Sequence, residues 1–149
     1  MRFDTHPTLA WLTCLGVLLA PPAMAEPTAW DQATVTALAE QLASSAGDLR
    51  NSVRRAPPLP GLTQRRARAQ VLDDLRVAEN SINSLARRLA AGAGREDTYP
   101  TFRRIRTLRN DIARQVQRAH ITEPTISKLE AARELLDQLM PFYAPGEVD

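Results

Sequence analysis

Cysteine and histidine, which commonly act as nucleophiles and metal ligands, are scarce in this chain of 149 residues. Its single cysteine is Cys14, inside an apolar run near the start, and its two histidines are His6 and His120. A disulfide needs two cysteines, and a transition-metal site ordinarily needs several nitrogen or sulfur ligands. The Cys-x-x-Cys-His motif that attaches a c-type haem is absent as well. We therefore expect no disulfide, no metal site and no cofactor.

Catalytic groupings are equally scarce. No cysteine nucleophile lies beyond Cys14, and no serine has an evident histidine and acid partner. Two pairs of acids exist, Asp73 with Asp74 and Glu130 with Glu134, but glycoside hydrolysis needs two carboxylates that face each other across a cleft. The acids are better explained as solvated faces of helices. We therefore expect a protein that is not an enzyme.

The beginning of the chain differs from the rest. Met1-Arg2 is followed by an apolar run over residues 9–20 and then by Ala23-Met24-Ala25, a small-x-small cleavage pattern. The run is too short to span a bilayer, which takes about 20 residues. We expect residues 1–25 to be a cleaved signal peptide and residues 26–149 to form one helical domain. The localisation predicted is periplasmic, without a stable membrane anchor after cleavage.

Four amphipathic segments follow, over about residues 29–55, 63–91, 100–119 and 122–140. In the second segment the apolar positions recur at steps of three and four, which is the spacing of a bundle core; they are Val71, Leu75, Ala78, Ile82, Leu85 and Leu89. No segment has the alternation of a strand, and the connections are short. The fold predicted is all-α, a four-helix up-down antiparallel bundle with a longer first hairpin.

Charge is distributed unevenly along the chain, although the net charge is only +2. Residues 50–118 hold sixteen arginines and six acids, whereas residues 123–149 hold two basic residues and six acids. The turn of the first hairpin, residues 56–61, is rich in proline and is flanked by a group of arginines that we call the basic tip. The basic tip consists of Arg54, Arg55, Arg65, Arg66 and Arg68.

The basic tip predicts a binding surface for an anionic envelope component or for an acidic protein. Nucleic acid is not an expected partner, because no aromatic side chain lies nearby on which a base could stack. The alternative is a solvated helix end that happens to be basic.

Two further arginines, Arg109 and Arg133, fall beside the apolar stripes of the third and fourth segments. One interpretation is a partly buried pair that binds an anion inside the bundle. The other is a pair of side chains that reach solvent and form ion pairs with Asp74, Glu130 or Asp137.

The fourth segment has a wider apolar arc than a surface helix needs, with Leu135, Leu139 and Phe142 as a candidate interaction face. The arc predicts either contact with a partner, such as a second copy in a homodimer, or packing of the C-terminal segment on the bundle.

The function expected is an exported binding or accessory protein that acts through the basic tip. The alternative is a helical adaptor, chaperone or immunity-type protein that acts through the fourth helix.

Overall fold

The computed structural model describes residues 28–57, 60–118 and 123–144, and this part of the chain contains four α-helices and no strand. The helices are α1 (Gln32–Arg55), α2 (Leu62–Ala90), α3 (Arg95–Arg118) and α4 (Glu123–Tyr143). The all-α, four-helix prediction is confirmed. The predicted signal peptide lies outside the described residues, and no described helix is long and apolar enough to cross a membrane.

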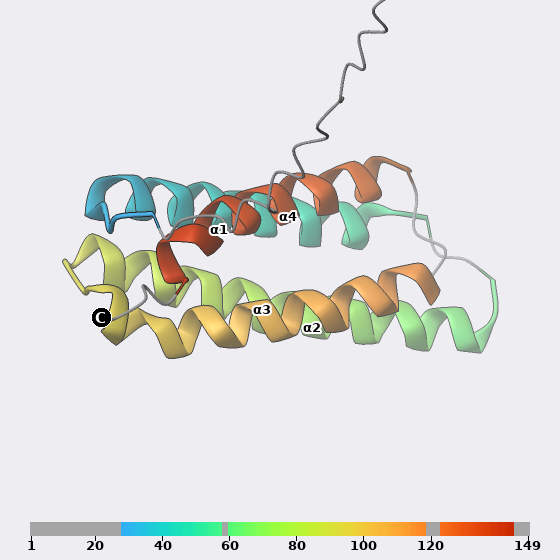
Figure 1. Cartoon of the computed structure of the whole chain (residues 1–149). Coiled ribbons are helices and arrows are strands. Elements are labelled where there is room, and N and C mark those ends of the chain that lie inside the picture. The colour runs from blue at the N-terminus through green and yellow to red at the C-terminus, as the bar shows by residue number, and fades with distance from the viewer. Residues whose placement is uncertain (1–27, 58–59, 119–122, 145–149) are drawn as a thin grey trace, which may run out of the picture.

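The helices pack as a bundle in which consecutive helices run in opposite directions, as the colour gradient of Figure 1 shows. α1 packs extensively on α2 and α4, and α2 packs on α3, but α3 and α4 touch over only a few residues. We call this narrow line of contact between α3 and α4 the seam. The first hairpin is the longer one, chiefly because α2 has 29 residues and α4 has 21. The start of α2 extends past the ends of α3 and α4 (Figure 1).

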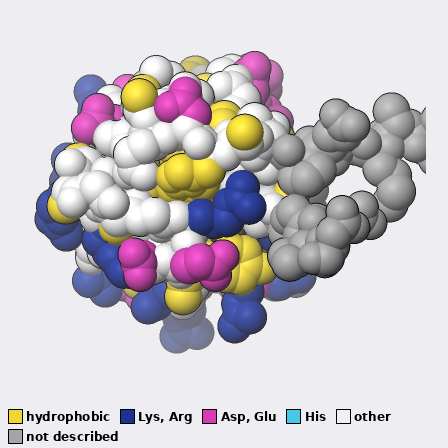
Figure 2. Space-filling view, turned by 60° about the vertical axis from the view of Figure 1, so that its left-hand side comes forward, with side chains coloured by type: hydrophobic (Ala, Val, Ile, Leu, Met, Phe, Trp, Pro, Cys, Tyr) yellow, Lys and Arg dark blue, Asp and Glu magenta, His cyan; other side chains and the backbone are white. Residues whose placement is uncertain are grey.

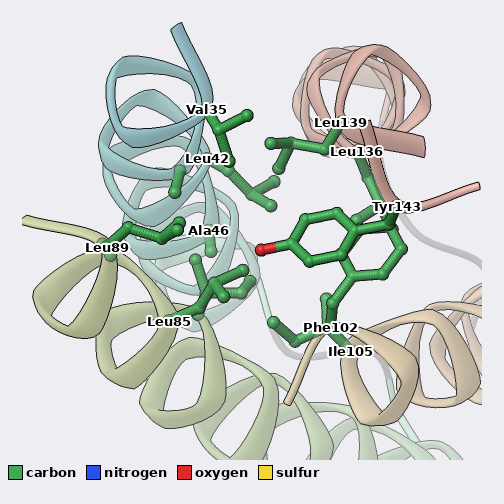
Figure 3. Packing of buried hydrophobic residues seen from close by; sticks show 13 residues of the cluster. Val35, Leu42, Ala46, Leu85, Leu89, Phe102, Ile105, Leu136, Leu139 and Tyr143 are labelled. Atoms are coloured by element: carbon green, nitrogen blue, oxygen red, sulfur yellow. The ribbon is translucent and has the colours of Figure 1, made fainter. Parts of the chain in front are cut away.

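The buried apolar side chains form two clusters along the bundle axis. The larger cluster lies toward the end where α1 begins, and it brings together side chains from all four helices, including Val35, Leu85, Phe102 and Leu139 (Figure 3). The smaller cluster lies toward the basic tip and includes Val71. The bundle is therefore stabilised by apolar burial, at about 25 cal/mol per Å² removed from water.

Core residues of different size occupy the different helix contacts. Ala39 and Ala46 of α1 and Ala86 of α2 are small and buried, and they permit close packing of those helices. Between α3 and α4 the core instead holds the rings of Phe102 and Tyr143, which stack with their centroids 4.0 Å apart. Two aromatic rings therefore occupy this contact, whereas α1 and α2 bury alanines.

Aromatic residues gather at the end of the bundle where α1 begins. Tyr143 also contacts Trp30 edge-on at 5.4 Å, and its hydroxyl group is hydrogen-bonded to the Thr98 hydroxyl at 2.8 Å. Gln32 donates hydrogen bonds to the carbonyl oxygens of Leu89 and Ala93, which satisfies the end of α2. This end of the bundle is thereby fixed by both stacking and hydrogen bonds.

Three helix boundaries differ from the expected ones by three residues or more. α1 begins at Gln32, after the N-cap Asp31, where the sequence suggested a start near residue 29. α3 begins at Arg95 and contains Pro100, where the sequence suggested a start at the proline. Glu96 and Asp97 occupy its first turn, and acids there are favoured by the helix dipole. α4 continues through Pro141 to Tyr143, because Tyr143 is buried between α3 and α4 and keeps the last turn in place.

Candidate functional site

The basic tip surrounds the turn between α1 and α2, and its five arginines differ in their surroundings. Arg54 and Arg55 lie in the last turn of α1, where a positive charge is favoured by the helix dipole. The Arg54 guanidinium donates a hydrogen bond to the Asn51 side chain, and Arg55 donates one to the Asn51 carbonyl oxygen. Both side chains remain exposed. They are held locally without being neutralised by an acid.

Arg68 has a structural contact that the other four lack. Its guanidinium donates hydrogen bonds to the carbonyl oxygens of Val53 at 2.9 Å and Arg54 at 2.7 Å. These oxygens belong to the last turn of α1 and have no partner within that helix. Arg68 therefore joins the start of α2 to the end of α1, and its charge is partly used within the fold.

Arg65 and Arg66 are exposed and form no ion pair with any described residue. They lie in the first turns of α2, which contain no acidic residue and no side-chain cap. The N-terminus of a helix carries a partial positive charge, so these arginines add to it instead of compensating it. This arrangement costs the fold some stability and leaves a concentrated positive charge facing solvent.

The positive charge extends beyond the basic tip as one layer of the bundle. α2 and α3 together carry thirteen arginines and six acids, whereas α1 and α4 carry five basic residues and six acids. Figure 2 looks partly onto the opposite end of the bundle, and most of its basic side chains lie in the lower half, where α2 and α3 run. The fold thus places a strongly basic layer, α2 and α3, beside a nearly neutral one, α1 and α4.

An apolar cavity of about 60 Å³ lies inside the bundle, at the junction of the two core clusters. Small residues on three helices leave this space unfilled, namely Ala46, Ala78 and Ala132. The lining residues that are not buried all come from α3 and α4. The cavity therefore opens at the seam.

Arg109 and Arg133 lie at the mouth of this cavity. Nη1 of Arg109 donates a hydrogen bond to Oδ1 of Asp137 at 2.5 Å, and Nε of Arg133 lies 3.7 Å from Oδ2 of the same carboxylate. Arg133 also lies 3.8 Å from Glu130. Ion pairing with Glu130 and Asp137, one of the two interpretations of the sequence, is confirmed. The structure adds that these two arginines, which line the apolar cavity, share one carboxylate that lies outside the cavity lining.

The candidate interaction face of α4 is largely used by the bundle itself. Leu139 has no exposed surface, and Leu135 and Phe142 are half-buried and pack against the larger core cluster. Exposed apolar surface on α4 is found instead at Ile126 and Met140, which are 36% and 38% exposed. Contact of a partner with Leu135 and Phe142 stays a prediction.

The described residues contain no group of three or more His, Cys, Asp or Glu side chains placed to hold a metal ion. His120 lies outside the part of the chain that the structure describes.

No protein-family model matches the chain, and no curated protein or solved structure is significantly similar to it.

Sequence patterns could not reveal the cavity, because its three alanines occupy ordinary core positions and only their alignment across three helices creates a space. The role of Tyr143 was missed for a different reason. It follows Pro141, and in a sequence a proline at this place is read as the end of a helix. The acids at Glu96 and Asp97 were the available signal for the earlier start of α3.

Proposed function

We propose that this protein is an exported, non-enzymatic binding or accessory protein whose basic tip contacts a phosphate-bearing surface of the cell envelope. The observation that supports this most is that Arg65 and Arg66 are exposed and form no ion pair within the described part of the chain, beside Arg54 and Arg55. The proposed export depends on cleavage of the leader after Ala25. An acidic protein partner is a related target, and the experiment below separates it from a lipid surface.

Arginine suits such a target because its planar guanidinium binds phosphate oxygens through two parallel hydrogen bonds. The four exposed arginines of the basic tip lie on two helices joined by a short turn, so they can meet one surface together. Each basic residue near an anionic membrane contributes about 1 kcal/mol to binding at physiological salt. Four of them acting together would give an attraction large enough for reversible attachment.

The alternative function, an adaptor that binds a protein through α4, is less well supported by the packing. Leu139 is buried and Leu135 and Phe142 already contact the core, so a partner would find only part of the expected face. Ile126 and Met140 lie fourteen positions apart on α4, about 21 Å along the helix, and do not form one patch.

The test is sedimentation of the purified protein with vesicles that contain phosphatidylglycerol, over a range of salt concentrations. The wild-type protein should bind at low salt and dissociate as salt rises. Vesicles of phosphatidylcholine alone should not bind. Binding to neither vesicle, together with salt-sensitive capture by an acidic protein column, would assign the basic tip to a protein partner.

A further inference from the structure

The cavity behind the seam combines three properties that together suit an amphiphile. Its wall is formed by apolar side chains of all four helices. Its mouth carries two guanidinium groups, and the side chain of Arg109 is only 28% exposed. It opens between α3 and α4, the two neighbouring helices of the bundle that share the least contact.

The carboxylate of Asp137 shows what the two arginines can bind. One of its oxygens accepts a hydrogen bond from Arg109, and the other faces Arg133. A carboxylate therefore fits between the two guanidinium groups, which line the apolar space although Asp137 itself does not. Asp137 is itself 42% exposed, so it can turn toward solvent if another carboxylate takes its place.

We propose that the seam binds a free single-chain fatty acid, whose tail enters the cavity and whose carboxylate replaces that of Asp137 between Arg109 and Arg133. A space of about 60 Å³ holds only the end of the tail, so the rest of the chain lies along the seam. The sparse contact between α3 and α4 makes this the place where the bundle widens with least loss of packing. Ile105 and Ile112, one turn on either side of Arg109, line the path.

The affinity for a ligand of this kind depends on its tail and its headgroup separately. Each methylene that enters an apolar site contributes enough to tighten binding about threefold to fourfold. The fatty-acid carboxylate can bind the Arg109 guanidinium only if it displaces the Asp137 carboxylate. Removal of Asp137 should therefore tighten binding, whereas removal of Arg109 should weaken it.

The experiment measures binding of hexanoate, octanoate and decanoate to the purified protein by calorimetry, below the micelle-forming concentration of each. Wild type should bind with an affinity that rises along the series, and decanol should bind at least tenfold more weakly than decanoate. Asp137→Asn should tighten decanoate binding about tenfold, and Arg109→Gln and Arg133→Gln should each weaken it by a similar factor. Ala132→Leu, which fills the cavity, should abolish binding.

Arg103→Gln is the matched control, because Arg103 is an exposed arginine of α3 with no ion pair among the described residues, and it should bind like wild type. Circular dichroism of every variant establishes that the bundle is intact. Arg133 is 55% exposed, so Arg133→Gln keeps the test informative if Arg109→Gln fails to fold. The proposal is overturned if decanoate and decanol bind equally, if Asp137→Asn fails to strengthen binding, or if Ala132→Leu binds as wild type does.

Discussion

The ring of Tyr143 at the end of α4 stacks on the ring of Phe102 in α3, with centroids 4.0 Å apart and ring planes inclined by 10°. Both residues are almost completely buried. Because α3 and α4 share few other contacts, this pair is a principal connection between them. It fixes the aromatic end of the seam, and the ion pair between Arg109 and Asp137 joins the same two helices at the cavity.

Tyr143→Ala should cost about 3–5 kcal/mol of unfolding free energy, since it removes a buried aromatic ring and leaves a cavity. Tyr143→Phe keeps the stacking and loses one hydrogen bond, which should cost about 0.5–1.5 kcal/mol. Thr98 keeps a partner in the second variant, because its hydroxyl group also donates to the Gly94 carbonyl oxygen. Urea denaturation measures both values, and equal costs would show that the ring does not connect the helices.

Alkaline pH should destabilise the protein through the same residue. Burial raises the pKa of Tyr143 above its ordinary value of 10, although the hydrogen bond with Thr98 acts in the opposite direction. The unfolded chain therefore loses this proton at a lower pH than the folded chain does. The contribution to stability is complete below pH 10 and declines as the pH rises beyond it. Unfolding of Tyr143→Phe should show a weaker dependence on pH in that range than wild type.

The core prediction compares two leucines of α2. Leu85 is fully buried and Leu62 is 67% exposed. Leu85→Ala should cost about 2–5 kcal/mol, because it removes packed methyl groups and leaves a space. Leu62→Ala should change stability by less than about 0.5 kcal/mol. Leu59, in the proline-rich turn that precedes α2, lies outside the described residues. Similar denaturation midpoints for the two variants would contradict the packing described above.

Within the basic tip, Arg68 and Arg65 should respond differently to substitution. Arg68→Ala removes two hydrogen bonds to carbonyl oxygens at the end of α1, and it should cost about 1 kcal/mol. Arg65→Ala removes an exposed charge from the start of α2, and it should leave stability unchanged or slightly increased. Thermal unfolding of the two variants checks this difference. A larger loss for Arg65→Ala would mean that Arg65 has a structural role.

The fold class and most of the core were predictable because they depend on the spacing of apolar residues. Val71, Leu75, Ile82 and Leu85 recur at helical intervals, and all four are buried. The helix ends were less predictable at the prolines. Pro100 and Pro141 resemble boundaries in sequence, yet both are inside helices that tertiary contacts extend.

The candidate sites were predictable to different degrees. The basic tip is visible in the sequence, since its arginines flank one turn, but the separate role of Arg68 depends on a contact between two helices. Arg109 and Arg133 stood out beside apolar stripes. Their common partner Asp137 and the cavity behind them depend on the distance between α3 and α4, which no local pattern specifies.

The central claim is that the position of the basic tip, and not the overall charge, determines binding to an anionic surface. One variant changes Arg54, Arg55, Arg65 and Arg66 to glutamine. A charge-matched variant changes four other exposed arginines without ion pairs among the described residues, namely Arg87, Arg103, Arg104 and Arg106. Neither set should alter the melting temperature appreciably, because exposed charges contribute little to stability.

The decisive measurement is the affinity of these two variants and wild type for phosphatidylglycerol vesicles at one physiological salt concentration. At about 1 kcal/mol for each arginine, the basic-tip variant should bind about a hundredfold to a thousandfold more weakly than wild type. The charge-matched variant should retain most of its affinity. Equal losses in the two variants, or undiminished binding by the basic-tip variant, would contradict the proposed role of the basic tip.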